Sequence, residues 1–155
     1  MTNTTDQPLQ TDRDAAGHST ANRFRRLVGY RTQAWREGYG EIVLDIRDDH
    51  MNSLGIVHGG VYAALLDAAF GQAACWCAVE GNVRSAVTVS LNTVFLAAVK
   101  SGRLVGYGRV ERIEGRVATI TGEIVADDGT ICATGQAAFM YMPGSEHRDG
   151  VPRQL

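Results

Sequence analysis

Apolar and polar residues follow two different patterns along the chain, and each predicts a different element. The segment from about Gly59 to Val79 is apolar around nearly its whole circumference, which predicts a long helix wrapped by other elements. After it, apolar residues alternate with polar ones, which predicts a strand from about Val87 to Val99. The hydrophobic period therefore changes from 3.6 to 2 residues where the long helix gives way to strands.

Weaker patterns predict the remaining elements. Two strands are expected at about 30–36 and 41–47, after a short amphipathic helix at 21–28. Turn signals recur at 100–102, 114–116 and 127–129, and a last strand is expected at 131–142, so this half reads as an antiparallel meander. A helix of about 21 residues and a strand of about ten have similar lengths, about 32 and 33 Å. The predicted fold class is therefore α+β, with a central helix lying along a curved antiparallel sheet.

Length and composition narrow the class of protein. The 155 residues suit one domain, expected over residues 21–142 between a disordered tail at 1–20 and a second tail at 143–155. The net charge of −2 leaves no basic surplus for binding nucleic acid. Asp67 within the apolar segment argues against a membrane span. An odd count of three cysteines, with no CxxC motif and no secretory signal, indicates a cytoplasmic protein.

Candidate chemistry gathers at the start of the long helix. Gly59 and Gly60 open the helix, so its free N–H groups can stabilise a developing oxyanion. Asp67 lies on the same helix, where a desolvated carboxylate would be a stronger base or nucleophile. Asn52 and His58 flank the helix start and can orient a water or a carbonyl group. Each of these signals is modest alone, and together they are specific.

Each of these features also has a purely structural interpretation. A Gly-Gly pair can serve close packing, a mid-helix Asp can be a satisfied polar group, and a histidine before a helix is often a cap or a hydrogen-bonded core residue. His50 and His58 have no third ligand at a suitable spacing, so the sequence predicts no metal site.

The segment His50-x-Asn52-x-x-Gly55-x-x-His58-Gly59-Gly60, followed by Asp67 and by Thr88–Leu96, resembles the hotdog-fold acyl-CoA thioesterases of the phenylacetate-degradation (PaaI) type, relatives of the 4-hydroxybenzoyl-CoA thioesterases. The resemblance covers about residues 28–142. It implies a hotdog fold, hydrolysis of acyl- or aryl-CoA without a cofactor, and dimers that commonly pair into homotetramers.

The same resemblance implies a role for each matching residue. Asp67 would be the nucleophile or the general base, and Thr88 would lie beside it. The N–H of Gly59 would polarise the thioester carbonyl, Asn52 would hold the water or the thioester, and His58 would support the reacting group. Further substrate-binding candidates are Gly60, His50, Phe70 and Arg116, the last as a contact for the phosphates of coenzyme A.

A distance argument independently favours a shared site. Gly59 and Asp67 are eight residues apart, which is about 12 Å along a helix, too far for one thioester carbon to touch both. Two antiparallel helices across a twofold axis would bring Asp67 of one chain towards Gly59 of the other. The sequence therefore predicts a homodimeric thioester hydrolase. The alternative is a non-catalytic hotdog protein that binds acyl-CoA or has a regulatory role.

Overall fold

The computed structural model describes residues 23–153, so the tail expected at 1–20 lies outside the described residues. The elements in chain order are α1 (Arg23–Val28), β1 (Arg31–Arg36), β2 (Tyr39–Asp45), the short 3₁₀ helix η1 (Asp48–His50), α2 (Gly59–Ala74), β3 (Asn82–Val83), β4 (Ala86–Phe95), β5 (Arg103–Glu114), β6 (Val117–Ala126), β7 (Ile131–Tyr141) and β8 (Val151–Pro152).

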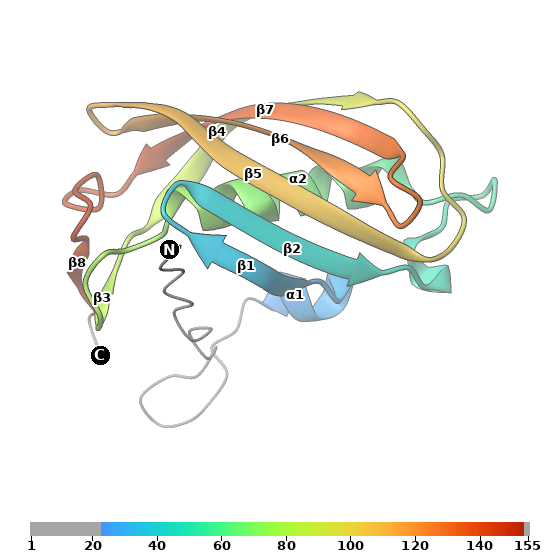
Figure 1. Ribbon diagram of the computed structural model, residues 1–155, viewed down its shortest axis with the longest axis horizontal. Coiled ribbons are helices and arrows are strands. Elements are labelled where there is room, and N and C mark those ends of the chain that lie inside the picture. The colour runs from blue at the N-terminus through green and yellow to red at the C-terminus, as the bar shows by residue number, and fades with distance from the viewer. Residues whose placement is uncertain (1–22, 154–155) are drawn as a thin grey trace, which may run out of the picture.

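A curved antiparallel sheet and one long helix make up the body of the fold. The sheet has six strands in the order β1-β2-β5-β6-β7-β4, and α2 lies along one of its faces (Figure 1). This is the α+β hotdog arrangement expected from the sequence. Within residues 23–153, no helix is long and apolar enough to cross a bilayer.

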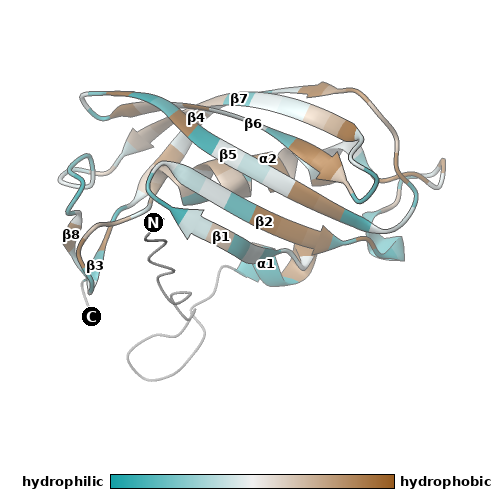
Figure 2. Ribbon diagram, viewed as in Figure 1, coloured by the Kyte–Doolittle hydropathy of each residue, from teal (hydrophilic) through white to brown (hydrophobic). Residues whose placement is uncertain are grey.

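The sheet-facing side of α2 is the centre of the core. Its buried residues recur at helical spacing: Tyr62, Leu65, Leu66, Ala69, Phe70, Ala73 and Ala74. They pack on the inward residues of the sheet, including the hydrophobic C-terminal half of β2 (Figure 2). Two glycines of the sheet let the helix approach closely. A Cβ added at Gly40 or Gly108 would lie only 2.6 or 2.7 Å from the Ala69 carbonyl oxygen.

We expect Gly108→Ala to lower the free energy of unfolding by about 2–3 kcal/mol, because the added methyl group meets helix backbone that cannot move independently. Gly71→Ala is the matched control. Its methyl group would lie 3.5 Å from the Phe139 ring, an ordinary contact, and alanine favours a helix by about 1 kcal/mol over glycine. Denaturant titration of both variants measures the difference. Equal stability of Gly108→Ala and the wild type would contradict this close approach.

The position of β4 differs from a simple reading of the chain order. Strands β5, β6 and β7 form the predicted meander, but β4 pairs with β7 and not with its sequence neighbour β5. The connection after Phe95 therefore crosses the end of the fold, where Val57 N–H donates to the Val99 carbonyl oxygen at 2.8 Å. This crossing leaves β4 at one edge of the sheet, with an unpaired side.

Helix α2 ends at Ala74, five residues before the predicted end at Val79. The segment after it is instead held by the chain beyond Met142, which packs on the fold where the sequence predicted a tail. Arg84 connects the two segments, since its guanidinium donates to the carbonyl oxygens of Trp76, Ser145 and Glu146. Strand β8 pairs with β3 beside this contact.

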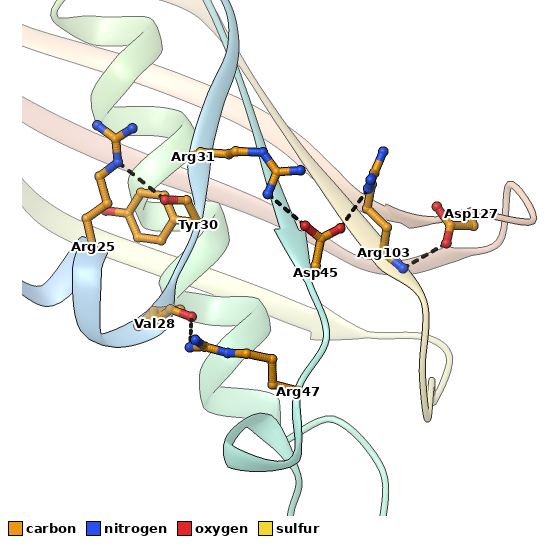
Figure 3. A network of polar contacts seen from close by, with 8 residues as sticks. All are labelled: Arg25, Val28, Tyr30, Arg31, Asp45, Arg47, Arg103 and Asp127. Atoms are coloured by element: carbon orange, nitrogen blue, oxygen red, sulfur yellow. Dashed lines mark hydrogen bonds and ion pairs between the residues drawn. The ribbon is translucent and has the colours of Figure 1, made fainter. Parts of the chain in front are cut away.

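The loop that leads into α2 is anchored to the first helix. Arg47 donates to the Val28 carbonyl oxygen at 3.0 Å, close to the ion pairs that Asp45 makes with Arg31 and Arg103 (Figure 3). These contacts bring the end of β2 and the start of β5 to the end of the molecule where α2 begins. Of these contacts, the one from Arg47 holds the loop that carries the predicted site residues.

Candidate active site

The Asp67 carboxylate points away from the core and towards the edge strand. Its neighbours Leu66 and Phe70 are fully buried against the sheet, whereas Asp67 itself is half-buried. Thr88 on β4 donates a hydrogen bond from Oγ1 to Asp67 Oδ1 at 2.6 Å. The pairing of these two residues agrees with the role expected for Thr88. In the single chain the Asp67 side chain keeps part of its contact with solvent.

The first turn of α2 presents an amide for an oxyanion. His58 is the N-cap, and its Nδ1 accepts a hydrogen bond from the Gly60 N–H at 2.8 Å. The first N–H groups of a helix have no acceptor within it, and none of the hydrogen bonds among residues 23–153 uses the Gly59 N–H. The cap therefore leaves the Gly59 N–H available at the positive end of the helix dipole.

Asn52 shapes the loop before the helix. Its side-chain oxygen accepts hydrogen bonds from the N–H groups of Leu54 and Ile56, at 2.9 and 3.3 Å. These contacts use the oxygen, and the side-chain amide nitrogen remains the group that can donate to a water or a thioester.

Two predicted substrate-binding residues are structural. His50 is buried; its Nδ1 accepts from the Arg47 N–H at 3.0 Å, and its Nε2 lies 2.8 Å from the Val28 carbonyl oxygen. Both ring nitrogens are thus used to hold the loop. Phe70 is fully buried in the core, because it lies on the sheet-facing side of α2. Neither side chain is placed to contact substrate.

Arg116 lies at the β5–β6 turn, and its guanidinium donates to the Tyr141 carbonyl oxygen through Nε and an Nη atom, at 2.9 and 2.7 Å. Arg116 directly precedes β6, and in the sheet order β6-β7-β4 the strand β7 separates it from β4. On β7, Tyr141 pairs with Ala86, two residues before Thr88. The phosphate contact expected of it stays a prediction.

Phe95, the last residue of β4, is the aromatic neighbour of the helix start. Its ring lies against Gly59: a Cβ added there would be 3.4 Å from the ring atoms Cε1 and Cζ. Tyr62 backs it, with the two ring centroids 6.3 Å apart. Burial raises the pKa of the Tyr62 phenol, whose oxygen has no hydrogen-bond partner in the described part of the chain. Sequence reasoning missed Tyr62. Its place one helical turn after Gly59 was the signal that could have found it.

Other concave surfaces do not coincide with these residues. Two shallow hollows lie over strands β4 to β7, and none of the predicted site residues lines either of them. Their linings include Thr121 and Thr134, whose pleat neighbours Ile120 and Ala133 are buried in the core, so the hollows lie on the face away from α2. Within residues 23–153, no group of three or more His, Cys, Asp or Glu side chains is arranged to hold a metal ion.

Comparisons with known proteins identify the family of this chain. Residues 54–133 match the sequence model of the Thioesterase superfamily. A Mycobacterium tuberculosis protein named "Putative esterase Rv1847" is 34% identical over 102 residues, which are 64% of this chain and 71% of that protein.

Solved structures of similar proteins share the fold. A "putative thioesterase, phenylacetic acid degradation-related protein" from Ralstonia eutropha JMP134 is 28% identical, with a TM-score of 0.70 and coverage of 81% of this chain and 94% of that one. The phenylacetic acid degradation protein PaaI of Thermus thermophilus is 24% identical, with a TM-score of 0.68 and coverage of 77% and 98%. The chain therefore belongs to the Thioesterase superfamily, with the hotdog fold and the class of thioester hydrolase expected from its sequence.

Proposed function

We propose that this protein hydrolyses an acyl-coenzyme A thioester to the free acid and coenzyme A, with Asp67 as the reacting carboxylate. The observation that carries the proposal is the hydrogen bond from Thr88 to Asp67 Oδ1 on the face of α2 that the core does not use. It orients the carboxylate and leaves the second oxygen open to a water or a carbonyl carbon. A half-buried aspartate with only a structural role would not need an exposed, oriented oxygen.

The proposed steps use the Asp67 carboxylate and the Gly59 N–H, which a dimer would supply from different copies of the chain. As a general base, Asp67 takes a proton from water while the oxygen of that water adds to the carbonyl carbon. The Gly59 N–H donates to the oxyanion that forms. The carbon–sulfur bond then breaks, and the departing thiolate takes the proton from Asp67. As a nucleophile, Asp67 would instead attack the carbonyl carbon and displace the coenzyme A thiolate, which takes a proton from water. Water then hydrolyses the resulting anhydride to the free acid and the Asp67 carboxylate.

A thiol-release assay across aromatic, short-chain and medium-chain acyl-CoA esters tests this function. Release of coenzyme A by the wild type, with loss of release in Asp67→Asn, supports it. Tight binding of acyl-CoA without release would favour the alternative of a non-catalytic binding or regulatory protein. If the protein neither binds nor cleaves any ester of the panel, both functions are excluded.

We further propose that two copies form a dimer that shares its sites. The edge strand β4 carries apolar side chains that are more than half exposed in the single chain, Val87, Val89 and Val94. An unpaired edge strand with exposed apolar side chains can pair with a strand of another chain. The free face of α2 beside Asp67 consists of small residues such as Ala63, Ala64 and Gly71, which allow a second helix to approach. A second copy would cover both surfaces.

The larger assembly and the location are also proposals. The family resemblance favours two such dimers in a homotetramer, and light scattering coupled to size exclusion measures the mass. The three cysteines are free thiols, which suits a reducing cytoplasm.

Mixing two inactive variants tests the shared site. Within a mixed dimer of Asp67→Asn and Gly59→Pro, one site keeps both the wild-type Asp67 and the wild-type Gly59 if the two come from different chains. We expect random re-association to restore about a quarter of the wild-type sites, since half of the dimers are mixed and each has one intact site. A mixture that stays inactive although mixed dimers form, as detected with two different affinity tags, would show that each site lies within one chain.

A further inference from the structure

The ring of Phe95 lies where it can contact an acyl group bound at Gly59. A Cα–Cβ bond tilts towards the N-terminus of its helix, the same direction in which the first N–H groups point. The ring occupies the Cβ direction of Gly59 at 3.4 Å, so it lies beside the open side of this amide. Any group that accepts a hydrogen bond from the Gly59 N–H is therefore next to the Phe95 ring.

The main chain holds this ring in a defined position. Phe95 is the last residue of β4 and pairs with Ala133 of β7. Directly after it, the N–H groups of Leu96 and Ala97 both donate to the Cys132 carbonyl oxygen, at 2.8 and 3.1 Å. Tyr62, only 3% exposed, supports the ring from the helix side. The ring is nevertheless 55% exposed in the single chain, so part of it is available for contact.

The polarity of the surroundings indicates which end of the substrate meets the ring. The aromatic rings of Phe95 and Tyr62 lie on the β4 side of the helix start. The loop on the way into the helix presents Asn52 and His58, with their polar groups and partly exposed main chain. An apolar acyl chain fits the aromatic side, and the polar pantetheine arm fits the loop.

We infer that Phe95 determines specificity by limiting the space beside the first carbon of the acyl chain, and so disfavours acyl groups that branch at this carbon. The inference rests on the proposed function for the pose of the carbonyl at Gly59. With that carbonyl oxygen about 2.9 Å from the Gly59 nitrogen, the first acyl carbon lies within about 5 Å of it, next to the ring. A methyl branch on this carbon competes with the ring for the same space, whereas a straight chain extends past it.

Butyryl-CoA and isobutyryl-CoA are the matched probes, since they contain the same atoms and differ in the position of one methyl group. Binding is measured by calorimetry in the Asp67→Asn background, in which the thioesters persist, with and without Phe95→Ala. We expect Phe95→Ala to improve the affinity for isobutyryl-CoA relative to butyryl-CoA by about tenfold, the size of effect typical of one methyl group in an apolar pocket. Phe95→Leu, which keeps part of the bulk, should shift the ratio by about threefold and decides the matter if Phe95→Ala does not fold.

Val94→Ala is the control, because Val94 is the preceding residue, is similarly exposed, and points to the opposite face of the sheet. An unchanged affinity ratio in Phe95→Ala, an equal shift in Val94→Ala, or no measurable binding of either thioester would overturn the inference. Wild-type turnover of butyryl-CoA is measured separately and reports on the proposed function. A shifted binding ratio without wild-type turnover would leave Phe95 as the wall of a binding site and would remove the hydrolytic role.

Discussion

Asp67→Asn is expected to lower kcat by at least about a thousandfold, because an amide is neither a nucleophile nor a base at neutral pH. The substitution keeps the shape of the side chain and an oxygen that can still accept the hydrogen bond from Thr88. We therefore expect an unchanged fold and assembly, and KM close to that of the wild type. The measurement is the rate of thiol release under saturating substrate, together with the melting temperature and the mass in solution.

Asp45→Asn is the matched control for this substitution. Asp45 forms ion pairs with Arg31 and Arg103 on the exposed end of β2, so its loss changes the same charge without touching Asp67 (Figure 3). We expect this variant to keep the wild-type kcat, since exposed ion pairs contribute about 1 kcal/mol or less to stability. More than a tenth of the wild-type kcat in Asp67→Asn would remove Asp67 from the reaction.

Gly59→Pro is expected to lower kcat by about 100- to 1000-fold, the range seen when one oxyanion donor is removed. Proline lacks an N–H and is well accepted at the first position of a helix. The residue before it must be extended, and His58 already has φ −64° and ψ 136°. The variant therefore removes the proposed donor while the helix keeps its start. Thiol release and circular dichroism measure the two effects separately.

Gly59→Ala separates the loss of the donor from the added bulk. Its methyl group would meet the Phe95 ring at 3.4 Å, an ordinary contact, and its N–H is retained. We expect this variant to keep clearly more activity than the proline variant. If both variants lose activity equally, the N–H of residue 59 is not the group that stabilises the transition state.

The features set by local chemistry were predictable from the sequence. The start of α2 follows from a histidine cap and two glycines, and the turns of the meander follow from glycines such as Gly115 and Gly129, which adopt positive φ. The hydrogen-bonded pair of Asp67 and Thr88 was also anticipated, although from the family resemblance and not from the spacing alone. The end of α2 was missed, because the apolar run continues past Cys75 and the contacts that hold the chain after it come from residues further along, such as Arg84 and Arg148.

The pattern along the chain by itself determined the fold class and the helix start, because hydrophobic period, caps and turns act within a few residues. Tertiary structure alone decided that β4 joins β7, that Phe70 fills the core while Asp67 points away from it, and that Phe95 lies on Gly59. Each of these depends on strand pairing or helix rotation across many residues, and neither has a local signal. The physical reason is that a side chain's neighbours across a sheet are chosen by the packing of the whole core.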